Sequence, residues 1–337
     1  MSITRRITIA DVAAEAGVSV STVSKVINDR YGVAEETSTR VRAVIAQMGF
    51  QSSLVAQSLR SSRTNVVGVF TADIEPFSVE LLKGVAQQIR GSGYELVVFT
   101  DCSQGDQHRD WEQRHLARVS TLTDGTILVT PRITELTSTG PIVAVDHNAR
   151  SASLPTVDSD NLHGAVSATE HLLGLRHRRI GFVAGRPDLA SAALREEGYR
   201  RALASAGIAF EPGLVRVGGF DPPAAAVAAH ELLTLDPRPT AIFAANDVSA
   251  IQVVEAARSL GLRVPEDLSV VGFDNVPESA LCDPPLTTID QFVQRMGSTA
   301  VRMLLELIED RTRPPEHVTL PTRLVVRSST RPPVDAA

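Results

Sequence analysis

Several residue types that mark whole classes of proteins are scarce in this chain of 337 residues. Its two cysteines, Cys102 and Cys282, are too few for a disulfide framework or a cysteine-based zinc site. No stretch approaches the ~18 uninterrupted apolar residues that a membrane span needs. The N-terminus MSITRRITIADV lacks the apolar segment of a secretory signal. These absences predict a cytoplasmic protein without a membrane anchor.

Sequence patterns of common catalytic centres are also missing. The eight histidines are scattered and show no His/Glu zinc spacing. No serine lies in a nucleophile elbow, and no glycine-rich phosphate loop follows a strand. The segment HRDWEQRH brings His108, Trp111 and His115 near one helical face, a pattern more typical of a solvated helix with a packed tryptophan than of a metal site. We therefore predict no enzymatic activity, no cofactor and no metal.

The residues that are present indicate a globular protein with an uneven charge distribution. Hydrophobic residues make up 43% of the chain and charged residues 21%, enough for a sizeable core. The length suggests two domains of about 150 residues, with room for a small third. The net charge is −6, yet residues 1–63 carry eight Lys and Arg against five Asp and Glu. A small basic head on an acidic body favours a localised anion-binding module.

The first 50 residues predict three short helices and no strand. Thr8 and Asp11 form a start that resembles a capping box, Gly17 allows a tight turn, and Ser19 is positioned to cap a second helix. The apolar positions recur at helical spacing: Ile9, Val12, Ala13, Ala16, Val23, Val26, Ile27, Val41, Val44, Ile45 and Met48. Two short helices joined through a glycine are typical of a helix-turn-helix, whose second helix lies in the DNA major groove. On this pattern alone, any other small three-helix domain is the alternative.

From residue 65 the pattern changes to alternating strands and helices. Apolar runs predict buried strands at 66–70, 96–100, 126–130, 142–146, 180–184, 241–245 and 268–273. Amphipathic stretches between them predict helices at 79–90, 161–173, 191–206, 248–260 and 292–309. Buried strands that alternate with helices are typical of doubly wound parallel sheets, so we predict an α/β body.

Polar and aromatic residues follow several of these strands. They are Asp73, Glu75, Phe77, Asp146, Ser191, Arg195, Phe220, Asn246, Asp247, Asp274 and Asn275. Ligands of open α/β sheets bind beyond the carboxyl ends of the strands. Carboxylates, amides and an arginine fork hydrogen-bond sugar hydroxyls, and a phenylalanine offers a flat apolar face. Taken singly, an aspartate at a strand end is more typical of a helix cap or a turn.

Longer strings in the sequence identify a family. The strings are TIADVAAEAGVSVSTVSKVIN, VAEETSTRVRAVIAQMGF, VAQSLRSSRTNVVGVF, HLLGLRHRRIGFVAG, AIFAAND, RVPEDLSVVGFDN and PPLTTIDQ. In content and order they resemble the LacI/GalR (lactose repressor) family over nearly the whole chain. The resemblance implies an N-terminal all-α helix-turn-helix head and an α/β periplasmic-binding-protein-like body of two doubly wound parallel-sheet lobes.

The resemblance also implies how the chain is divided. Residues 1–50 would form the DNA-binding domain, residues 51–63 a hinge segment, and residues 64–330 the effector-binding and dimerisation domain. One lobe would span about 65–158 and 291–320, and the other about 161–288 and 321–329. The tail RPPVDAA has no leucine heptad, so no tetramerisation helix is expected.

The resemblance implies a homodimer that binds double-stranded palindromic operator DNA through both heads. In the second helix, Val20, Ser21 and Lys25 are suited to base edges in the major groove. The groups better suited to phosphate contacts are Arg5, Ser19, Thr22, Ser24 and the backbone near Asn28. Because Val20 and Ser21 are small, we expect methyl contacts and single hydrogen bonds rather than bidentate readout.

The hinge segment QSSLVAQSLRSSR is too short for a stable isolated helix. In the resembled family it folds on operator DNA, and its leucine, here Leu59, wedges into the minor groove at the centre of the site. Arg60 follows, where a minor-groove cation would lie. Ser52 stands where the family usually has proline, which predicts a looser helix start. From composition alone, a flexible tether with an incidental leucine is the alternative.

For the cleft, the resemblance implies effector contacts from Asp146, Arg195, Asn246 and Asp274, with a sugar or sugar phosphate as the usual ligand. Three residues chosen for their chemistry complete the predicted effector site, which is Phe77, Asp146, Ser191, Arg195, Phe220, Asn246 and Asp274. Two roles stay open for Phe77, which also fits as packing under the cleft. The same holds for Asn246 and Asp247, since one of them would only cap the next helix.

Together these features predict a ligand-responsive transcription factor, a repressor controlled by a sugar or a related small metabolite. Effector binding would change the angle between the lobes and so change the operator affinity. One alternative is a co-repressor-dependent regulator that responds to a purine or a phosphoprotein. Another is a solute-binding protein with the same body fold, although such a protein needs a secretory signal and no DNA-binding head.

Overall fold

The structure, a computed structural model, describes residues 7–27, 30–50, 63–100, 115–117, 119, 122–131, 140–147 and 154–334. The chain forms two compact units, Met1–Thr64 and Asn65–Ala337. Several positions discussed above lie outside the described residues: Arg5, Asn28, Ser52, Leu59, Arg60, His108 and Trp111. Among the residues that are described, no helix is long and apolar enough to cross a membrane.

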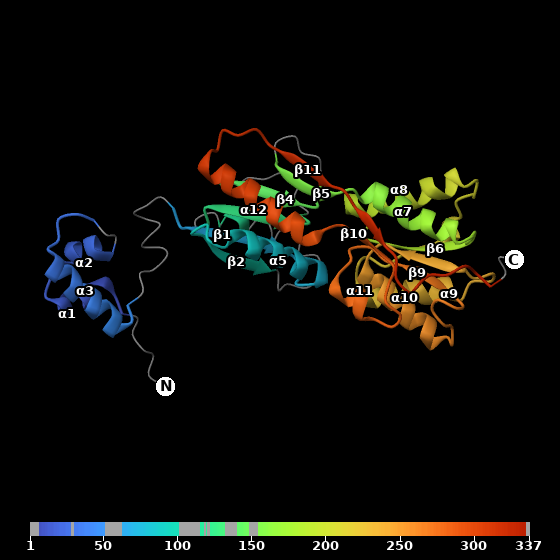
Figure 1. Cartoon of the computed structure of the whole chain (residues 1–337), viewed down its shortest axis with the longest axis horizontal. Helices are drawn as coiled ribbons and strands as arrows, with labels where there is room; N and C mark the ends of the chain where they lie inside the picture. Colours follow the sequence, from blue (N-terminus) through green and yellow to red (C-terminus); the bar gives the residue numbers. More distant parts are fainter. Residues whose placement is uncertain are drawn as a thin grey trace. The chain divides into compact units, whose positions relative to one another are not determined.

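The first unit contains three helices, which are α1 (Ile9–Ala16), α2 (Val20–Ile27) and α3 (Glu35–Met48) (Figure 1). The predicted capping box is formed. The Thr8 hydroxyl accepts the Asp11 amide hydrogen, and the Asp11 carboxylate accepts the Thr8 amide hydrogen at 2.7 Å. Gly17 ends α1 with a φ of 65°, a conformation that favours glycine. The helices bury a small core of Val12, Ala13, Ala16, Val23, Val26 and Val41. The predicted helix-turn-helix is confirmed.

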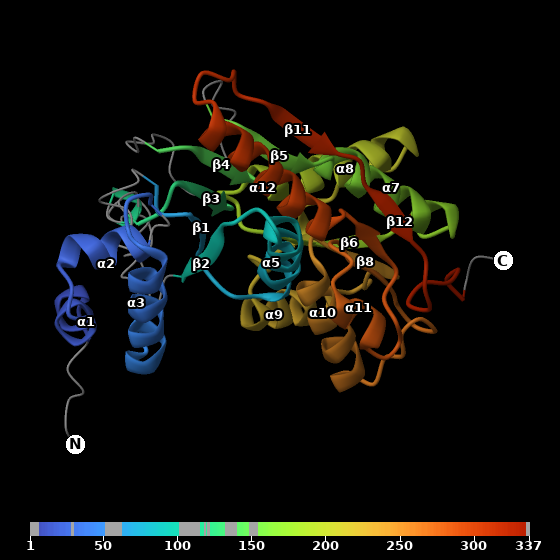
Figure 2. The same cartoon turned by 60° about the vertical axis from the view of Figure 1, so that its left-hand side comes forward.

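The second unit begins with a six-stranded parallel sheet in the order β11-β5-β4-β3-β1-β2. Its strands are β1 (Val66–Thr71), β2 (Glu95–Thr100), β3 (Gly125–Val129), β4 (Ile142–Val145), β5 (Thr156–Ser159) and β11 (His317–Leu320). Helices α5 (Pro76–Ile89) and α12 (Val293–Glu309) pack on each other and on one face of this sheet (Figure 2). We call this sheet and its helices lobe 1.

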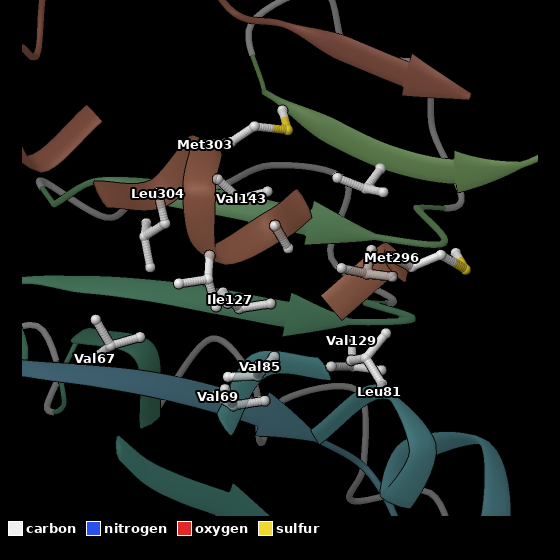
Figure 3. Close-up of a cluster of buried hydrophobic side chains, with 14 of the residues drawn as sticks. Val67, Val69, Leu81, Val85, Ile127, Val129, Val143, Met296, Met303 and Leu304 are labelled. Atoms are coloured by element: carbon white, nitrogen blue, oxygen red, sulfur yellow. The ribbon is translucent and has the colours of Figure 1, made fainter. Parts of the chain in front are cut away.

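The core of lobe 1 lies between the sheet and the pair α5 and α12 (Figure 3). Its fully buried side chains include Val67, Val69, Val85, Ile127, Val143 and Leu304. The two helices approach each other at glycines. A β-carbon at Gly84 would lie 1.9 Å from the Gln294 carbonyl oxygen, and one at Gly297 would lie 2.3 Å from the Leu81 carbonyl oxygen. Because real β-carbons do not approach so closely, this helix pair requires both glycines.

Lobe 2 is built on a four-stranded parallel sheet in the order β7-β6-β8-β9. Its strands are β6 (Ile180–Ala184), β7 (Val215–Val217), β8 (Ala241–Ala244) and β9 (Ser269–Val271). One face packs against α7 (Asn161–Gly174) and α8 (Ala190–Ser205), and the other against α9 (Pro222–Leu233) and α10 (Asp247–Ser259) (Figure 1). A single 3₁₀ turn (Pro212–Leu214) precedes β7, and α11 (Pro277–Leu281) follows β9.

The chain crosses between the lobes three times: between β5 and α7, between β9 and α12, and after β11. In the second and third crossings β10 (Thr288–Asp290) pairs with β12 (Arg323–Val325) as an antiparallel ribbon. The predicted fold class, a helix-turn-helix head with two doubly wound parallel lobes, is confirmed. The apolar runs in the sequence do not predict β5, β7, β10 or β11, which are short and partly polar.

Candidate functional site

A cavity of about 430 Å³ lies at the carboxyl ends of the strands of both lobes. The segments that line it follow β1, β3 and β4 of lobe 1 and β6 to β9 of lobe 2, as expected for open α/β sheets. Its volume falls in the range of about 300–1,000 Å³ that is typical of small-molecule sites. All seven residues of the predicted effector site line this cavity: Phe77, Asp146, Ser191, Arg195, Phe220, Asn246 and Asp274.

Arg195 lies in α8 and is only 4% exposed. Its Nε donates to Asn161 Oδ1 at 2.8 Å, and its Nη1 donates to the Ala245 carbonyl oxygen at 2.5 Å. The same Nη1 lies 3.3 Å from Asp274 Oδ1. The guanidinium carbon is 3.8 Å from the centre of the Phe273 ring, a cation–π contact. These contacts fix the guanidinium before a ligand arrives.

Asp274 follows β9 and is buried beside Arg195. Gln291 Nε2 donates to Asp274 Oδ1 at 2.6 Å, and Gln291 Oε1 accepts from the Ser159 hydroxyl at 2.7 Å. Burial raises the pKa of Asp274 well above its usual range, although the charge of Arg195 opposes this shift. Ser159 ends β5 and Gln291 follows β10, so these hydrogen bonds connect the cavity to two of the crossing segments.

Two phenylalanines give the cavity flat apolar surfaces. Phe220 precedes α9 with a φ of 63°, and its ring packs on Gly185, where a β-carbon would lie 2.1 Å from the ring. The Arg195 guanidinium carbon lies 5.6 Å from the centre of the same ring. Phe77 does both things that the sequence left open, since it lines the cavity and packs against the core of lobe 1.

Asn246 and Asp247 differ in position although they are adjacent in the chain. Asn246 lines the cavity, and its Oδ1 also caps α10 by accepting the Ser249 amide hydrogen at 2.9 Å. Asp247 is fully buried outside the cavity lining, where its carboxylate accepts from the Thr288 hydroxyl at 2.5 Å and the Val276 amide at 3.0 Å. Burial raises the pKa of Asp247 to about 7. Asp247 therefore ties α10 to β10, and Asn246 is the residue available to a ligand.

Three carboxylates of lobe 1 line the cavity: Asp73, Glu75 and Asp146. The Ser191 hydroxyl of lobe 2 donates to Asp146 Oδ2 at 3.0 Å, a direct hydrogen bond between the lobes. Burial raises the pKa of Asp146. Burial and then the neighbouring charge of Asp73 raise the pKa of Glu75 to about 7. Among the described residues, none of the three carboxylates forms an ion pair with an arginine or lysine.

Two charged residues of the lining were not predicted. Arg186 follows β6, and its Nε and Nη2 both donate to the Asp188 carboxylate at 3.1 Å. Asp221 caps α9 by accepting the Ala224 amide hydrogen at 3.0 Å. Most of the other site residues were predicted because they follow an apolar strand run. Arg186 follows β6 and could have been predicted in the same way. Asp221 follows β7, a strand that the sequence pattern does not reveal.

Unusual backbone conformations concentrate at the cavity. Of the eight non-glycine residues with positive φ in the described chain, four line it, namely Thr130, Asp146, Phe220 and Asp274. Such conformations cost on the order of 1–3 kcal/mol each and persist where the surrounding structure holds them, often at ligand sites. The backbone thus aims three of the predicted effector residues into the cavity.

In the head, the outer face of α2 is open to other molecules. Val20, Ser21 and Lys25 are exposed on it, with 43% of Val20 accessible. The Ser19 hydroxyl accepts the Thr22 amide hydrogen at 3.1 Å, so Ser19 caps α2 as predicted. The DNA contacts assigned to these residues stay predictions.

A helix-turn-helix head and a two-lobed body with a polar cavity define a DNA-binding regulator with a periplasmic-binding-protein-like body. Two family models match the chain. The model of bacterial regulatory proteins of the lacI family covers residues 8–53, and the model of the periplasmic binding protein-like domain covers residues 169–330.

Similar proteins and structures span nearly the whole chain. The HTH-type transcriptional repressor PurR of Aliivibrio salmonicida (strain LFI1238) is 35% identical over 318 residues, which is 90% of this chain and 93% of that protein. A transcriptional regulator CelR–cellobiose complex has a TM-score of 0.73 and 30% identity, covering 96% of this chain and 100% of that one. The lac repressor dimer bound to operator and the anti-inducer ONPF has a TM-score of 0.83 and 27% identity, covering 97% and 100%. The chain belongs to the LacI family of bacterial regulatory proteins, and it is a DNA-binding regulator of transcription.

Proposed function

We propose that this protein is a homodimeric repressor whose affinity for a palindromic operator changes when a sugar or a related small metabolite binds the cavity. One observation carries the proposal. Seven strand ends of two lobes bring carboxylates, an amide, a buried guanidinium and a phenylalanine ring to one cavity. A ligand that touches both lobes favours one angle between them, and by linkage it changes the affinity of the heads for DNA.

The chemistry of the lining supports a polyhydroxylated effector. Carboxylate and amide groups accept and donate to hydroxyls, and the fixed fork of Arg195 donates to ring or glycosidic oxygens. Phe220 offers a face for the apolar side of a sugar ring. A similar solved structure is described as a cellobiose complex. We assign the effector contacts to Phe77, Asp146, Ser191, Arg195, Phe220, Asn246 and Asp274.

In the head, we assign α2 as the recognition helix. Its exposed Val20, Ser21 and Lys25 would face base edges in the major groove, where Lys25 donates to guanine acceptors. Phosphate contacts would come from Arg5, Ser19, Thr22, Ser24 and the backbone near Asn28. Leu59 and Arg60 would enter the minor groove at the centre of the operator. A similar lac repressor structure is bound to operator, which supports this mode.

Exposed apolar side chains on lobe 2 support a homodimer. Leu281 of α11 is 83% exposed and Val326 is 58% exposed. Their segments adjoin, because Arg327 donates to the Ser279 hydroxyl at 3.3 Å and to the Leu286 carbonyl oxygen at 2.6 Å. A second copy that covers this patch would remove apolar surface from water. Two-fold symmetry would then present two heads to the two half-sites of a palindrome in the cytoplasm.

A second candidate is a regulator that needs a co-repressor, such as a purine or a phosphoprotein, in order to bind DNA. Similar repressors named PurR favour this candidate. Both candidates are regulators rather than enzymes, which agrees with the repressor names of the relatives.

Operator binding by the full chain tests the two candidates. Fluorescence anisotropy would measure the affinity for a palindromic operator with and without sugars and purines. An inducing sugar should lower the affinity about 5- to 150-fold, the usual range of allosteric coupling. A purine that raises the affinity by a similar factor would favour the co-repressor instead. An affinity that no sugar changes would contradict the sugar effector, and an affinity that no purine changes would contradict a purine co-repressor.

A further inference from the structure

We propose that the cavity selects a sugar that carries a protonated amine, and that Asp73 and Glu75 impose this selection. The inference rests on the proposed function, because it names the class of sugar that acts on the same site. According to this inference, the cavity binds amino sugars more tightly than neutral sugars or sugar phosphates.

The first support is the balance of charge in the cavity lining. Among the described residues, the lining contains five carboxyl groups and two guanidiniums, which are Asp73, Glu75, Asp146, Asp221, Asp274, Arg186 and Arg195. Charges within a cavity interact more strongly than charges in water, because the local dielectric is lower. Where these carboxyl groups are ionised, a phosphate group would meet more negative than positive charge on the described lining, whereas an ammonium group would meet an attractive surface.

Both guanidiniums of the lining are already bound to protein groups. Arg186 donates two hydrogen bonds to Asp188 at 3.1 Å. Arg195 uses its Nε and Nη1 for Asn161, the Ala245 carbonyl oxygen and Asp274. Among the described residues, neither arginine forms an ion pair with a carboxylate of lobe 1, although the charges of Arg186 and Arg195 act on these carboxylates at longer range. A ligand that carries a positive charge would meet these carboxylates directly.

Glu75 is the most informative of these carboxylates. It occupies the N-cap position of α5, yet its side chain makes no cap hydrogen bond to that helix. The carboxylate instead lines the cavity, two residues from Asp73. Burial and then the charge of Asp73 raise the pKa of Glu75 to about 7, and the charge of Arg186 opposes this shift only in part. The charges of Glu75 and Asp146 also act on Asp274, so carboxylates of both lobes face the same space.

An ammonium group fits this arrangement better than a hydroxyl group. A hydroxyl donates one hydrogen bond and brings no charge, so the carboxylates would stay uncompensated. An ammonium donates three hydrogen bonds and carries a full charge. A hydrogen bond with an ionised donor or acceptor is roughly twice as strong as a neutral one, and the ammonium adds a Coulombic attraction to the carboxylates that a hydroxyl lacks. An amino sugar should therefore bind about 10- to 100-fold more tightly than the neutral sugar of the same shape.

Matched sugars test the selection on the full chain. The probes are glucose, glucosamine and glucose 6-phosphate, together with cellobiose and the β-1,4-linked glucosamine disaccharide that has the same shape. Titration calorimetry at a pH below the amine pKa would measure each affinity. We expect the amine member of a pair to bind about 10- to 100-fold more tightly than the neutral member. The phosphate should bind most weakly.

Substitutions test whether Asp73 and Glu75 cause the preference for an amino sugar. The double variant Asp73→Asn/Glu75→Gln keeps the size of both side chains and should reduce the preference for the amine to within about threefold. Glu95→Gln is the matched control, because Glu95 is exposed on β2 outside the cavity lining. The control should keep the full preference. A double variant that keeps it too would overturn the assignment to Asp73 and Glu75.

The outcomes separate this inference from the proposed function. A neutral sugar or a sugar phosphate that binds as tightly as the amine would overturn the inference. If that sugar also changed operator affinity, the proposed function would stand without it. If none of these sugars bound at millimolar concentration, while the chain still bound operator DNA, the inference would be wrong, and the proposed function would stand or fall by the operator titrations with other sugars.

Discussion

The two walls of the cavity differ in how their charged side chains are paired. In lobe 2, Arg195 pairs with Asp274, Arg186 pairs with Asp188, and Asp221 caps a helix. In lobe 1, Asp73, Glu75 and Asp146 line the same cavity without an ion pair to any described arginine or lysine. Lobe 2 thus presents a preorganised surface, and in the proposed site lobe 1 presents carboxylates whose charge a ligand would balance. The comparison suggests that lobe 2 provides affinity and lobe 1 provides selectivity.

The difference also bears on how the lobes respond to a ligand. In the described structure Ser191 donates to Asp146 from one lobe to the other. The charges of Glu75 and Asp146 raise the pKa of Asp274 across the cavity, in addition to the larger effect of burial. The walls of the cavity therefore both attract and repel each other. A ligand that satisfies the carboxylates of lobe 1 would remove the repulsion and favour a closed arrangement.

Arg195→Ala should have the largest effect, because it removes the buried ion pair between Arg195 and Asp274 in lobe 2. Asp274 would be left buried without its cation, and removing one partner of a buried pair costs about 3–5 kcal/mol of unfolding free energy. Chemical denaturation of the full chain would measure this loss. The variant should also lose its response to the effector while it keeps operator affinity in the absence of effector, since the head is unchanged.

Two outcomes for Arg195→Ala would contradict this account. Unchanged stability would mean that Asp274 becomes neutral or solvated at little cost, so the wall of lobe 2 would not depend on the pair. Retained effector affinity with lost coupling would mean that Arg195 transmits the signal and does not hold the ligand. Calorimetry on the variant distinguishes this second outcome.

Alanine substitutions at two glycines compare how tightly the helix pairs of lobe 1 and lobe 2 are packed. A β-carbon at Gly84 would lie 1.9 Å from a backbone oxygen of α12, and one at Gly198 of α8 would lie 2.5 Å from the Leu162 carbonyl oxygen of α7. Overpacking costs about 1–3 kcal/mol, so Gly84→Ala should reach about 3 kcal/mol and Gly198→Ala about half as much. Thermal denaturation of both variants gives the order, and a reversed order would show that α5 and α12 separate more easily than α7 and α8.

Glu75→Gln should change the pH dependence of stability. The folded protein holds the Glu75 proton up to about pH 7, whereas the unfolded chain releases it near the usual pKa of 4.5. The raised pKa therefore destabilises the fold increasingly as the pH rises from 4.5 through 7, and the penalty is complete above 7. Removing the carboxyl should stabilise the protein by about 2 kcal/mol more at pH 8 than at pH 5.

The control for this prediction is Glu95→Gln, which makes the same chemical change at an exposed site of lobe 1. Denaturation curves of the three proteins at both pH values give the comparison. If Glu75→Gln were no more stabilising at pH 8 than at pH 5, Glu75 would have a counter-ion in solution, and lobe 1 would not lack charge there.

Lys25→Ala should have the smallest effect on the body. Because Lys25 is exposed on α2, the variant should keep its stability and its affinity for the effector. If Lys25 contacts base edges, the variant should lose about 1–3 kcal/mol of operator binding and discriminate less between bases. If it contacts only phosphate, binding to all sequences should weaken equally and the salt slope should fall by about one. Titrations of operator and random DNA over a range of salt distinguish the two roles.

Much of the fold follows from local sequence patterns. The capping box of α1, the glycine turn and the buried apolar runs predict the head and most strands, because each depends on residues close together in the chain. The strands β5, β7, β10 and β11 carry short stretches such as TVDS and VRV. These strands form because they pair with strands that are distant in the sequence. A stretch of three or four residues does not show such pairing, so the sequence pattern does not predict them.

The position of the site can be predicted from the sequence, but the pairing of the charges within it cannot. Residues that follow parallel strands meet at one edge of a sheet, so the sequence brings seven candidates to the lining of one cavity. Their contact with a ligand stays a prediction. Which charges find partners depends on distant segments, as when Gln291 reaches Asp274 or Thr288 reaches Asp247. The uncompensated carboxylates of lobe 1 become visible only in three dimensions.

The most direct test of the account measures operator affinity and cavity occupancy together. Fluorescence anisotropy of the full chain with operator DNA would be followed as a ligand is added, and calorimetry would give the affinity of that ligand for the protein alone. The account predicts that operator affinity changes about 5- to 150-fold at the ligand concentrations that fill the cavity, and that Arg195→Ala abolishes the change. A ligand that fills the cavity and leaves operator affinity unchanged would contradict it.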